Sequence, residues 1–213
     1  MLPSTTVCDL GILIDSSGAM WSHVWLMVSG CFAVLRQLRS IRCSVSDSVF
    51  HALVVSLVMP CRDYGNATLA GLPTSQLRQL QSVLNVAARL KHRSSRYEHI
   101  TPMLWDLHWL WSPERIDFKL AMLIYRCLHS LAPQYLYNYV QRVTDSNSCR
   151  LRSSSSSQLV IRHTRLSTVG DCTFPVAASR LWNSLPPIIT SAPTLTVFRN
   201  RLKPYLFSQS FPS

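Results

Sequence analysis

The sequence holds few carboxylates, and no two of them are adjacent. Ten Asp and Glu residues are scattered over 213 positions. Polymerisation by two-metal catalysis requires carboxylates close together on a tight turn, because they share Mg²⁺ ions about 4 Å apart. No Asp-Asp pair offers such a turn. This pattern excludes a polymerase active site of that kind among these residues.

The local signatures of several other active sites are also missing. The chain contains no GxxxxGK[ST] or GxGxxG loop, no HExxH pair and no GxSxG turn. Its His and Cys residues lack zinc-finger spacing. His99 and His108 are nine residues apart, which matches no standard metal-ligand pattern, and an ordinary surface or core role is expected for both. We therefore expect no catalytic, cofactor-binding or metal-binding residue and no small-molecule substrate.

The seven cysteines form no disulfide framework. Their number is odd, their spacing is wide, and no CxxC pair occurs. This usage is typical of an intracellular protein with reduced, mostly buried thiols. The first residues make a poor signal peptide, because no basic region is present and Asp9 and Asp15 follow. We expect a nuclear or cytoplasmic protein that is not secreted.

The apolar runs are short for a membrane span. The stretch 24–35 is followed by Arg36, Arg39 and Arg42, which superficially suits an anchor. Spanning a bilayer takes about 20 apolar residues, and polar residues dilute this stretch. The run 49–59 is shorter still. Both are expected to be buried helices without membrane contact, and membrane attachment through 24–35 is a third-ranked hypothesis.

Positive charge is in excess and is unevenly placed. The chain has 21 Lys and Arg against 10 Asp and Glu, a net charge of +11. Residues 1–90 carry a net +2 and residues 91–213 a net +9. Basic surfaces attract polyanions through counterion release and steering. The expected partner is RNA or DNA, bound without sequence preference, and the alternative is a solvated basic surface with no partner.

Hydrophobic periodicity predicts a mainly α fold. With 47% apolar residues the chain can bury a core. Residues 7–15 are predicted to form one short strand, and residues 158–169 one or two. A composition shift near residue 95 suggests two regions, 1–95 and 96–213, the second with a Ser-rich loop near 144–157. Helices are expected over 20–41, from 46 or 47 to 59 with a stop at Pro60, from 73 or 74 to about 93, from 101, from 113 to about 131, before 185, and over 194–206.

Two basic clusters are the candidate nucleic-acid-binding residues. Guanidinium groups contact phosphates, and exposed aromatic rings can stack on unpaired bases. Tyr97, Trp105, Trp109 and Trp111 lie near the first cluster. The alternatives are core packing for the tryptophans and a solvated surface for the arginines. The candidates are Arg89, Lys91, Arg93, Arg96, Arg150, Arg152, Arg162 and Arg165.

Four stretches, in order, resemble the C-terminal (thumb and post-thumb) part of a non-LTR, LINE-type (jockey-like) retrotransposon reverse transcriptase. Residues 9–39 contain DLGILIDSS, MWSHV and CFAVLRQLR, similar to the region after the palm. Residues 63–90 contain DYGNATLAGLP and LQSVLNVAARL, similar to the thumb. The following block, residues 99–133, contains HITP, LHWL, RIDFKLA and YRCLHSLAP. The last, residues 151–207, contains LRSS, GDCTF, AASRLWNSLP and FRNRLK.

The resemblance implies a helical thumb-like bundle over 1–95 and a second, basic helical region over 96–213. It implies a truncated, catalytically inactive remnant of an RNA-directed DNA polymerase, because the endonuclease, fingers and palm of the family have no counterpart in these residues. A thumb would grip the template–primer duplex by shape and phosphate contact, without reading bases. Residual non-specific RNA or DNA binding is therefore the expected activity.

Several positions depart from the family pattern. Cys8 stands where Arg is usual, Cys61-Arg62 where Arg-Leu is usual, and Gly65 where Cys is usual, and Trp111-Ser112 replaces the usual Pro. Arg62 would place a charge in a normally apolar helix end, at a cost of about 1–3 kcal/mol if buried. Arg-to-Cys changes resemble mutational decay, so a non-functional translated pseudogene is one alternative. The other is a helical protein-interaction module, since a thumb without its palm exposes apolar surface.

Overall fold

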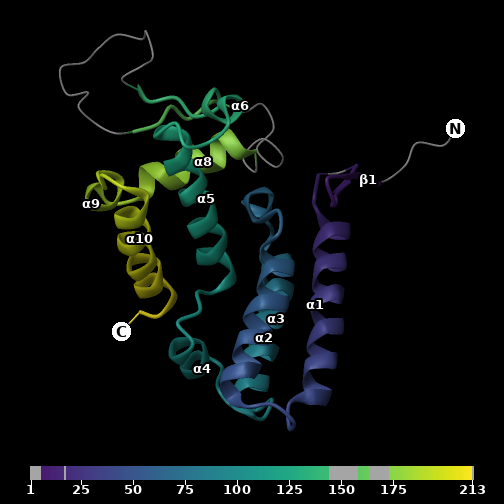
Figure 1. Ribbon diagram of the computed structural model, residues 1–213. Helices are drawn as coiled ribbons and strands as arrows, with labels where there is room; N and C mark the ends of the chain where they lie inside the picture. The colour runs from purple at the N-terminus through teal and green to yellow at the C-terminus, as the bar shows by residue number, and fades with distance from the viewer. Residues whose placement is uncertain (1–5, 17, 144–157, 164–172, 213) are drawn as a thin grey trace, which may run out of the picture. The chain divides into compact units, whose positions relative to one another are not determined.

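The structure is mainly helical, which confirms the fold class predicted from the sequence (Figure 1). The computed structural model describes residues 6–16, 18–143, 158–163 and 173–212. Its strands and helices are β1 (Thr6–Asp9), β2 (Ile12–Asp15), α1 (Trp21–Ile41), α2 (Asp47–Asp63), the short 3₁₀ helix η1 (Asn66–Leu69), α3 (Thr74–His92), α4 (Thr101–Asp106), α5 (Ser112–Leu128), α6 (Gln134–Tyr137), α8 (Phe174–Ser184), α9 (Pro187–Thr190) and α10 (Leu195–Ser210).

The chain divides into two compact units. Unit 1 comprises Met1–Asn66 and Leu72–Pro113, and unit 2 comprises Ala67–Gly71 and Glu114–Ser213. The boundary expected near residue 95 from composition falls inside unit 1, because α4 packs against α3. The change in charge along the sequence therefore does not coincide with the change in packing.

Unit 1 is built on three helices that pack against one another. Each of α1, α2 and α3 contacts the other two, and Figure 1 shows them side by side. Apolar residues recur every three or four positions on each helix, which places them on one face. The fully or almost fully buried ones include Val24, Cys31, Leu35, Phe50, Val54, Val58, Leu80, Val83, Leu84 and Ala87.

The start of α2 is as predicted, but its end is not. The hydroxyl of Ser46 accepts a hydrogen bond from the backbone N–H of Val49 at 3.4 Å, as an N-cap does. The helix continues through Pro60 to Asp63, so the predicted stop at Pro60 is wrong. A proline removes one helical N–H. Met59 and Arg62 are buried on either side of it, and this packing holds the last turn.

The strand predicted over residues 7–15 is instead a β-hairpin. β1 and β2 pair antiparallel, with Thr6 opposite Asp15 and Asp9 opposite Ile12. Leu10 and Gly11 form the turn with φ of 47° and 80°. Positive φ at both turn residues matches the twist of a two-residue hairpin and suits glycine. The single-strand prediction was wrong because Gly11 was read as part of a continuous strand.

The core of unit 2 forms around α5. Four apolar residues that recur every three or four positions along it, Ile116, Leu120, Ile124 and Cys127, are buried. The ring of Tyr125 stacks on Phe198 of α10 with 4.5 Å between centroids, and its hydroxyl donates to the carbonyl of Ala192 at 2.9 Å. α10 begins one residue after the predicted start, and Thr194 caps it by accepting from the N–H of Val197 at 3.3 Å.

The strands expected over residues 158–169 are only partly covered by the described residues. Leu159 pairs with Arg142 in an isolated antiparallel bridge. Asn183 of α8 accepts from the N–H of Leu159 at 2.8 Å and donates to its carbonyl at 3.0 Å. Residues 164–169 and the expected loop at 144–157 lie outside the described residues.

Among the described helices, α1 is the one long and apolar enough to cross a membrane by length and composition. It is 21 residues long, so the helix extends beyond the apolar stretch considered in the sequence. Val24, Cys31 and Leu35 on α1 are buried within unit 1. A core helix meets the same criterion, so this property does not indicate a membrane.

Candidate functional site

A cavity rich in arginine lies where α1 and α3 end in unit 1. Its volume is about 590 Å³. The walls come from the last turn of α1, the residues just after it, the end of α3 and the segment that follows. None of these lining residues is acidic. They are Arg39, Arg42, Cys43, Val86, Arg89, Leu90, Arg93, Ser94 and Arg96.

Part of this positive charge is explained by the position of the arginines at the C-terminal ends of helices. The last carbonyls of an α-helix have no partner within the helix and carry a partial negative charge, which favours nearby cations. Arg39 lies in the last turn of α1, and Arg89 and Lys91 lie in the last turn of α3. Arg93 ends α3 in the left-handed conformation, with φ of 54°. Arginines at these positions stabilise the helices whether or not a ligand binds.

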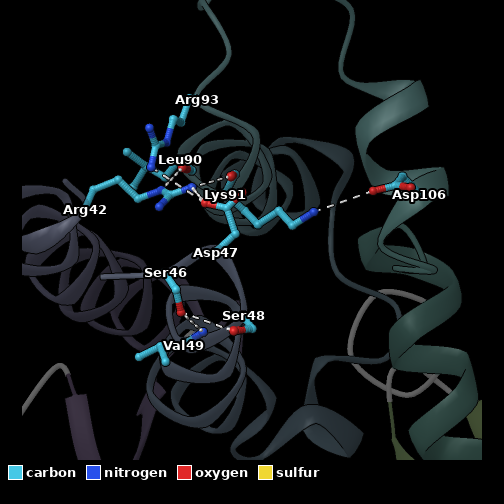
Figure 2. A network of polar contacts seen from close by, with 9 residues as sticks. All are labelled: Arg42, Ser46, Asp47, Ser48, Val49, Leu90, Lys91, Arg93 and Asp106. Atoms are coloured by element: carbon cyan, nitrogen blue, oxygen red, sulfur yellow. Dashed lines mark hydrogen bonds and ion pairs between the residues drawn. The ribbon is translucent and has the colours of Figure 1, made fainter. Parts of the chain in front are cut away.

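Arg42 is an internal anchor of the cavity wall. Its side chain is buried and donates from Nε to the carbonyl of Leu90 and from Nη2 to that of Lys91, both at 2.9 Å. Nη2 also pairs with Asp47 at 2.6 Å, as Figure 2 shows. The guanidinium lies 4.5 Å from the centroid of the Phe50 ring. Arg42 thus joins the end of α1 to the start of α2 and satisfies two terminal carbonyls of α3.

Asp47 is the carboxylate nearest this network. The hydrogen bond and charge of Arg42 hold its pKa below the usual range, with smaller contributions from Arg93 and Lys91. Its side chain is exposed, so solvent screens these charges. Asp47 mainly neutralises Arg42, because its distance to Arg93 Nη2 is longer, at 3.7 Å.

Three exposed arginines at the cavity are weakly engaged. Arg39 makes no side-chain hydrogen bond or ion pair among the described residues. Arg93 has only the long contact to Asp47. Arg96 donates to the hydroxyl of Tyr97 and lies 4.7 Å from the centroid of that ring. These guanidinium groups are free to bind an anion without breaking a buried contact.

Two of the predicted binding residues contact other groups of the protein itself. Arg89 donates to the carbonyl of Glu98 at 3.3 Å. The ammonium of Lys91 lies 3.7 Å from Asp106, and the imidazole of His92 lies 3.5 Å from the same carboxylate. Partial burial lowers the pKa of His92, with the charge of Lys91 adding to the effect. Lys91 does not line the cavity, so its predicted role as a binding residue gains no support from the geometry.

Of the second predicted basic cluster, the structure describes only one residue. Arg162 is exposed in unit 2 and donates to the carbonyl of Asn138 at 3.2 Å. Arg150, Arg152 and Arg165 lie outside the described residues. The structure therefore brings together three members of the first cluster and leaves the second as a prediction.

Arg39 and Arg42 are not among the residues predicted to bind. They are about 50 positions away from the α3 cluster in the sequence, and only the packing of α1 on α3 brings them together. The signal in the sequence is the run of three arginines after the apolar stretch 24–35. It marks the end of α1, where Arg39 lies in the last turn and Arg42 caps the helix.

The aromatic residues near the first cluster divide between core and surface. Trp109 is buried and lies 6.2 Å, ring to ring, from His51. Core packing, the alternative given for the tryptophans, is therefore correct for Trp109. Tyr97 is 79% exposed beside Arg96, and Trp105 is 51% exposed. Of these rings, Tyr97 is the one placed next to a cavity arginine.

The described cysteines are all free, as expected, but they are not mostly buried. Cys31 and Cys127 are buried, whereas Cys8, Cys43 and Cys61 are exposed. Cys8 lies on the strand β1, Cys43 lies in the turn after α1, and Cys61 lies on the exposed face of α2. Within the described part of the chain, no group of three or more His, Cys, Asp or Glu residues is arranged to hold a metal ion.

Comparison of the chain with protein-family models, with curated proteins and with solved structures finds no match. Arg39, Arg93 and Arg96 offer weakly engaged guanidinium groups at one cavity, and Arg42 fixes the wall behind them. This arrangement is suited to binding an extended anion.

Proposed function

We propose that the chain binds the phosphate backbone of RNA or DNA through the basic cavity of unit 1, without reading base sequence. The observation that carries this proposal is the set of five arginines that line one cavity with no acidic side chain among the lining residues. Guanidinium groups bind phosphate oxygens in a bidentate manner, and arginine is the preferred residue for this contact.

Local charge supports the proposal. The segments 36–47 and 89–106 together carry seven Arg and Lys against three Asp and Glu, a net of +4. Two of the three acids, Asp47 and Asp106, are already in contact with basic side chains. An excess of positive charge on one surface raises both the rate and the strength of binding to a polyanion.

The geometry favours contact with the backbone over recognition of bases. Asn and Gln, which read adenine, do not line the cavity, and arginine is also the residue that most readily contacts phosphate oxygens. Tyr97, which is exposed next to Arg96, can stack on an unpaired base of any kind. The proposed binding is therefore tolerant of sequence.

The resemblance to LINE-type reverse transcriptases fits this proposal. In that reading the chain is a truncated remnant of an RNA-directed DNA polymerase that has no polymerase activity and retains nucleic-acid affinity. The thumb-like part corresponds to residues 1–95 in the resemblance, and the cavity is formed mostly within them. Polymerase activity of the purified chain on a primed template would contradict the inactive-remnant reading.

The proposal is tested by comparing two variants that each lose two positive charges. The first is Arg39→Gln with Arg96→Gln, which removes two exposed arginines of the cavity. The second, the control, is Arg199→Gln with Lys203→Gln on the exposed side of α10 in unit 2. Binding to a fluorescent RNA–DNA duplex is measured by anisotropy at about 0.1 M salt, where each phosphate contact contributes roughly eightfold to the affinity.

The cavity variant is expected to bind roughly 30- to 100-fold more weakly than the wild type. The control is expected to change affinity by less than about threefold. Equal losses of affinity in the two variants would show that binding depends on the overall charge of the protein and not on the cavity. This result would overturn the proposal. Absence of binding by the wild type at low salt would overturn it as well.

A helical protein-interaction module is the second candidate, and it has an observation of its own. Trp21, Trp25 and Leu26 are each 45–66% exposed on α1, and with Leu13 they line a cavity of about 480 Å³. Exposed apolar patches of this kind mark interaction surfaces. Such a surface needs an occupant of matching chemistry.

The occupant that this surface suits is a second copy of the chain. Asp15 bonds to Ser22 at the Trp-bearing end of α1, whereas Arg36 and Arg39 lie at its other end. Two antiparallel copies of α1 would cover both tryptophans and bring opposite charges together. Sedimentation should then show concentration-dependent dimers that Trp25→Ser abolishes, and a monomer at all concentrations excludes this candidate.

A further inference from the structure

The packing of α1 against α2 brings together two cysteines that are thirty positions apart in the sequence. The side chains of Cys31 and Cys61 are neighbours at the contact between α1 and α2. Gly30 precedes Cys31, and the Sγ atom of Cys61 lies 3.9 Å from the position that a Cβ would occupy on this glycine. The Cys61 sulfur therefore lies against α1 next to Cys31.

The two thiols have different surroundings. Cys31 is fully buried, and its Sγ lies 4.0 Å from the carbonyl oxygen of Val58, three residues before Cys61 on α2. Cys61 is exposed. Burial, followed by the neighbouring Cys61, raises the pKa of Cys31 to about 12. Cys31 alone is thus a protonated thiol with little reactivity, while Cys61 is open to reagents in solvent.

We propose that Cys31 and Cys61 form an oxidation site, at which a peroxide converts the two thiols into a disulfide that joins α1 to α2. The exposed cysteine reacts first and the buried cysteine resolves the product. Neither cysteine lines the basic cavity, so this inference does not depend on nucleic-acid binding.

The chemistry balances with hydrogen peroxide as the oxidant. The Cys61 thiolate attacks one peroxide oxygen, the O–O bond breaks, and Cys61 sulfenic acid and hydroxide form. The Cys31 sulfur then attacks the Cys61 sulfur, the S–O bond breaks, and the Cys31 proton passes to the departing hydroxide, which becomes water. In total, two thiols and one peroxide give one disulfide and two water molecules.

The pairing distinguishes Cys61 from the other exposed cysteines in the described part of the chain. Cys8 and Cys43 are exposed, and among the described residues neither shares a hydrogen bond with another cysteine. An exposed sulfenic acid without a nearby thiol persists or oxidises further. A sulfenic acid at Cys61 has the Cys31 thiol as its neighbour, and this thiol resolves it to the disulfide.

Peptide mapping of the reduced chain after treatment with one equivalent of hydrogen peroxide tests the inference. Remaining thiols are alkylated before digestion, so that each of the seven cysteines is scored as free, sulfenic or cross-linked. The expected result is a single major cross-link between the peptides of Cys31 and Cys61. Cross-links distributed among other cysteines, or persistent sulfenic acid at Cys61 in the wild type, would overturn the proposal.

Three variants separate the two steps. In Cys31→Ala, Cys61 should stop at the sulfenic acid and be labelled by dimedone. In Cys61→Ser, Cys31 should remain a thiol at the same peroxide dose. Cys43→Ser, which removes an exposed cysteine outside the pair, should form the cross-link as the wild type does. Dimedone labelling of Cys61 that is equal in the wild type and in Cys31→Ala would show that Cys31 does not resolve it.

Discussion

The guanidinium of Arg62 donates a hydrogen bond to the hydroxyl of Ser112 over 2.8 Å, and both side chains are almost completely buried. Gln81 completes the site, because its side-chain oxygen accepts from the backbone N–H of Ser112 at 2.8 Å and from the hydroxyl at 3.0 Å. Asp63 pairs with Arg62 at 3.2 Å. A buried charge is tolerated when polar partners of this kind surround it.

Loss of the Ser112 hydroxyl should destabilise unit 1. Ser112→Ala leaves the buried guanidinium of Arg62 with one partner fewer, and an unsatisfied donor on a charged group costs about 1–3 kcal/mol. The free energy of unfolding is measured with urea by circular dichroism. Ser40→Ala, at an exposed serine on α1, is the control and should change stability by less than about 0.5 kcal/mol. A similar small effect for Ser112→Ala would show that the network contributes little.

The same pair bears on the hypothesis of a decayed pseudogene. Arg62 and Ser112 are both positions where the chain departs from the reverse-transcriptase pattern, and they bond to each other. If each of these two unusual residues had arisen by independent mutational decay, a hydrogen bond between them would not be expected. A double-mutant cycle of Arg62→Met and Ser112→Ala should therefore show a coupling of about 1 kcal/mol or more, and additive effects would contradict this interpretation.

Mutation of Arg42 should destabilise the protein much more than mutation of Arg39. Arg42→Met removes hydrogen bonds to the carbonyls of Leu90 and Lys91 and the ion pair with Asp47, so we expect a loss of about 2–4 kcal/mol in unfolding free energy. Arg39→Met should cost less than about 0.5 kcal/mol, because its side chain is exposed. Chemical denaturation measures both, and equal effects on stability would refute the assignment of Arg42 as the structural arginine.

Asp117 should make unit 2 less stable as pH rises. Burial, with the nearby charge of Glu114, raises the pKa of Asp117 from 3.8 to about 6. The folded state therefore holds a proton between these values that the unfolded state releases, so stability is greatest below about pH 4 and falls as pH rises to about 6. Asp117→Asn should raise the unfolding free energy by about 1–2 kcal/mol at pH 7 and leave it unchanged near pH 4. A gain of equal size at both pH values would refute the raised pKa.

The helices were predictable because their signals are local. The stripe on α3 was read at three-residue to four-residue spacing, and Leu80, Leu84 and Ala87 are buried as that spacing predicts. Ser46 and Thr194 were also predictable, since capping depends on a side chain and an N–H three residues ahead. The continuation of α2 past Pro60 was not predicted, because it depends on tertiary packing, whereas the hairpin at Leu10 and Gly11 has a local turn signal that the single-strand prediction did not use.

The candidate site was only half predictable for the same reason. Arg89, Arg93 and Arg96 are adjacent in sequence and were selected together, whereas Arg39 joins them only through the packing of α1 on α3. The sequence also contains no sign that Lys91 turns toward Asp106. The pairing of Cys31 with Cys61 is likewise a product of tertiary structure.

The salt dependence of binding to an RNA–DNA duplex tests the central claim most directly. The logarithm of the association constant is plotted against the logarithm of KCl concentration for the wild type, for Arg39→Gln with Arg96→Gln, and for the α10 control. Each lost phosphate contact lowers the steepness by about 0.9. The account predicts a linear fall for the wild type, a slope shallower by about 2 in the cavity variant, and an unchanged slope in the control. A wild-type affinity that does not vary with salt, or the same slope in all three proteins, would contradict it.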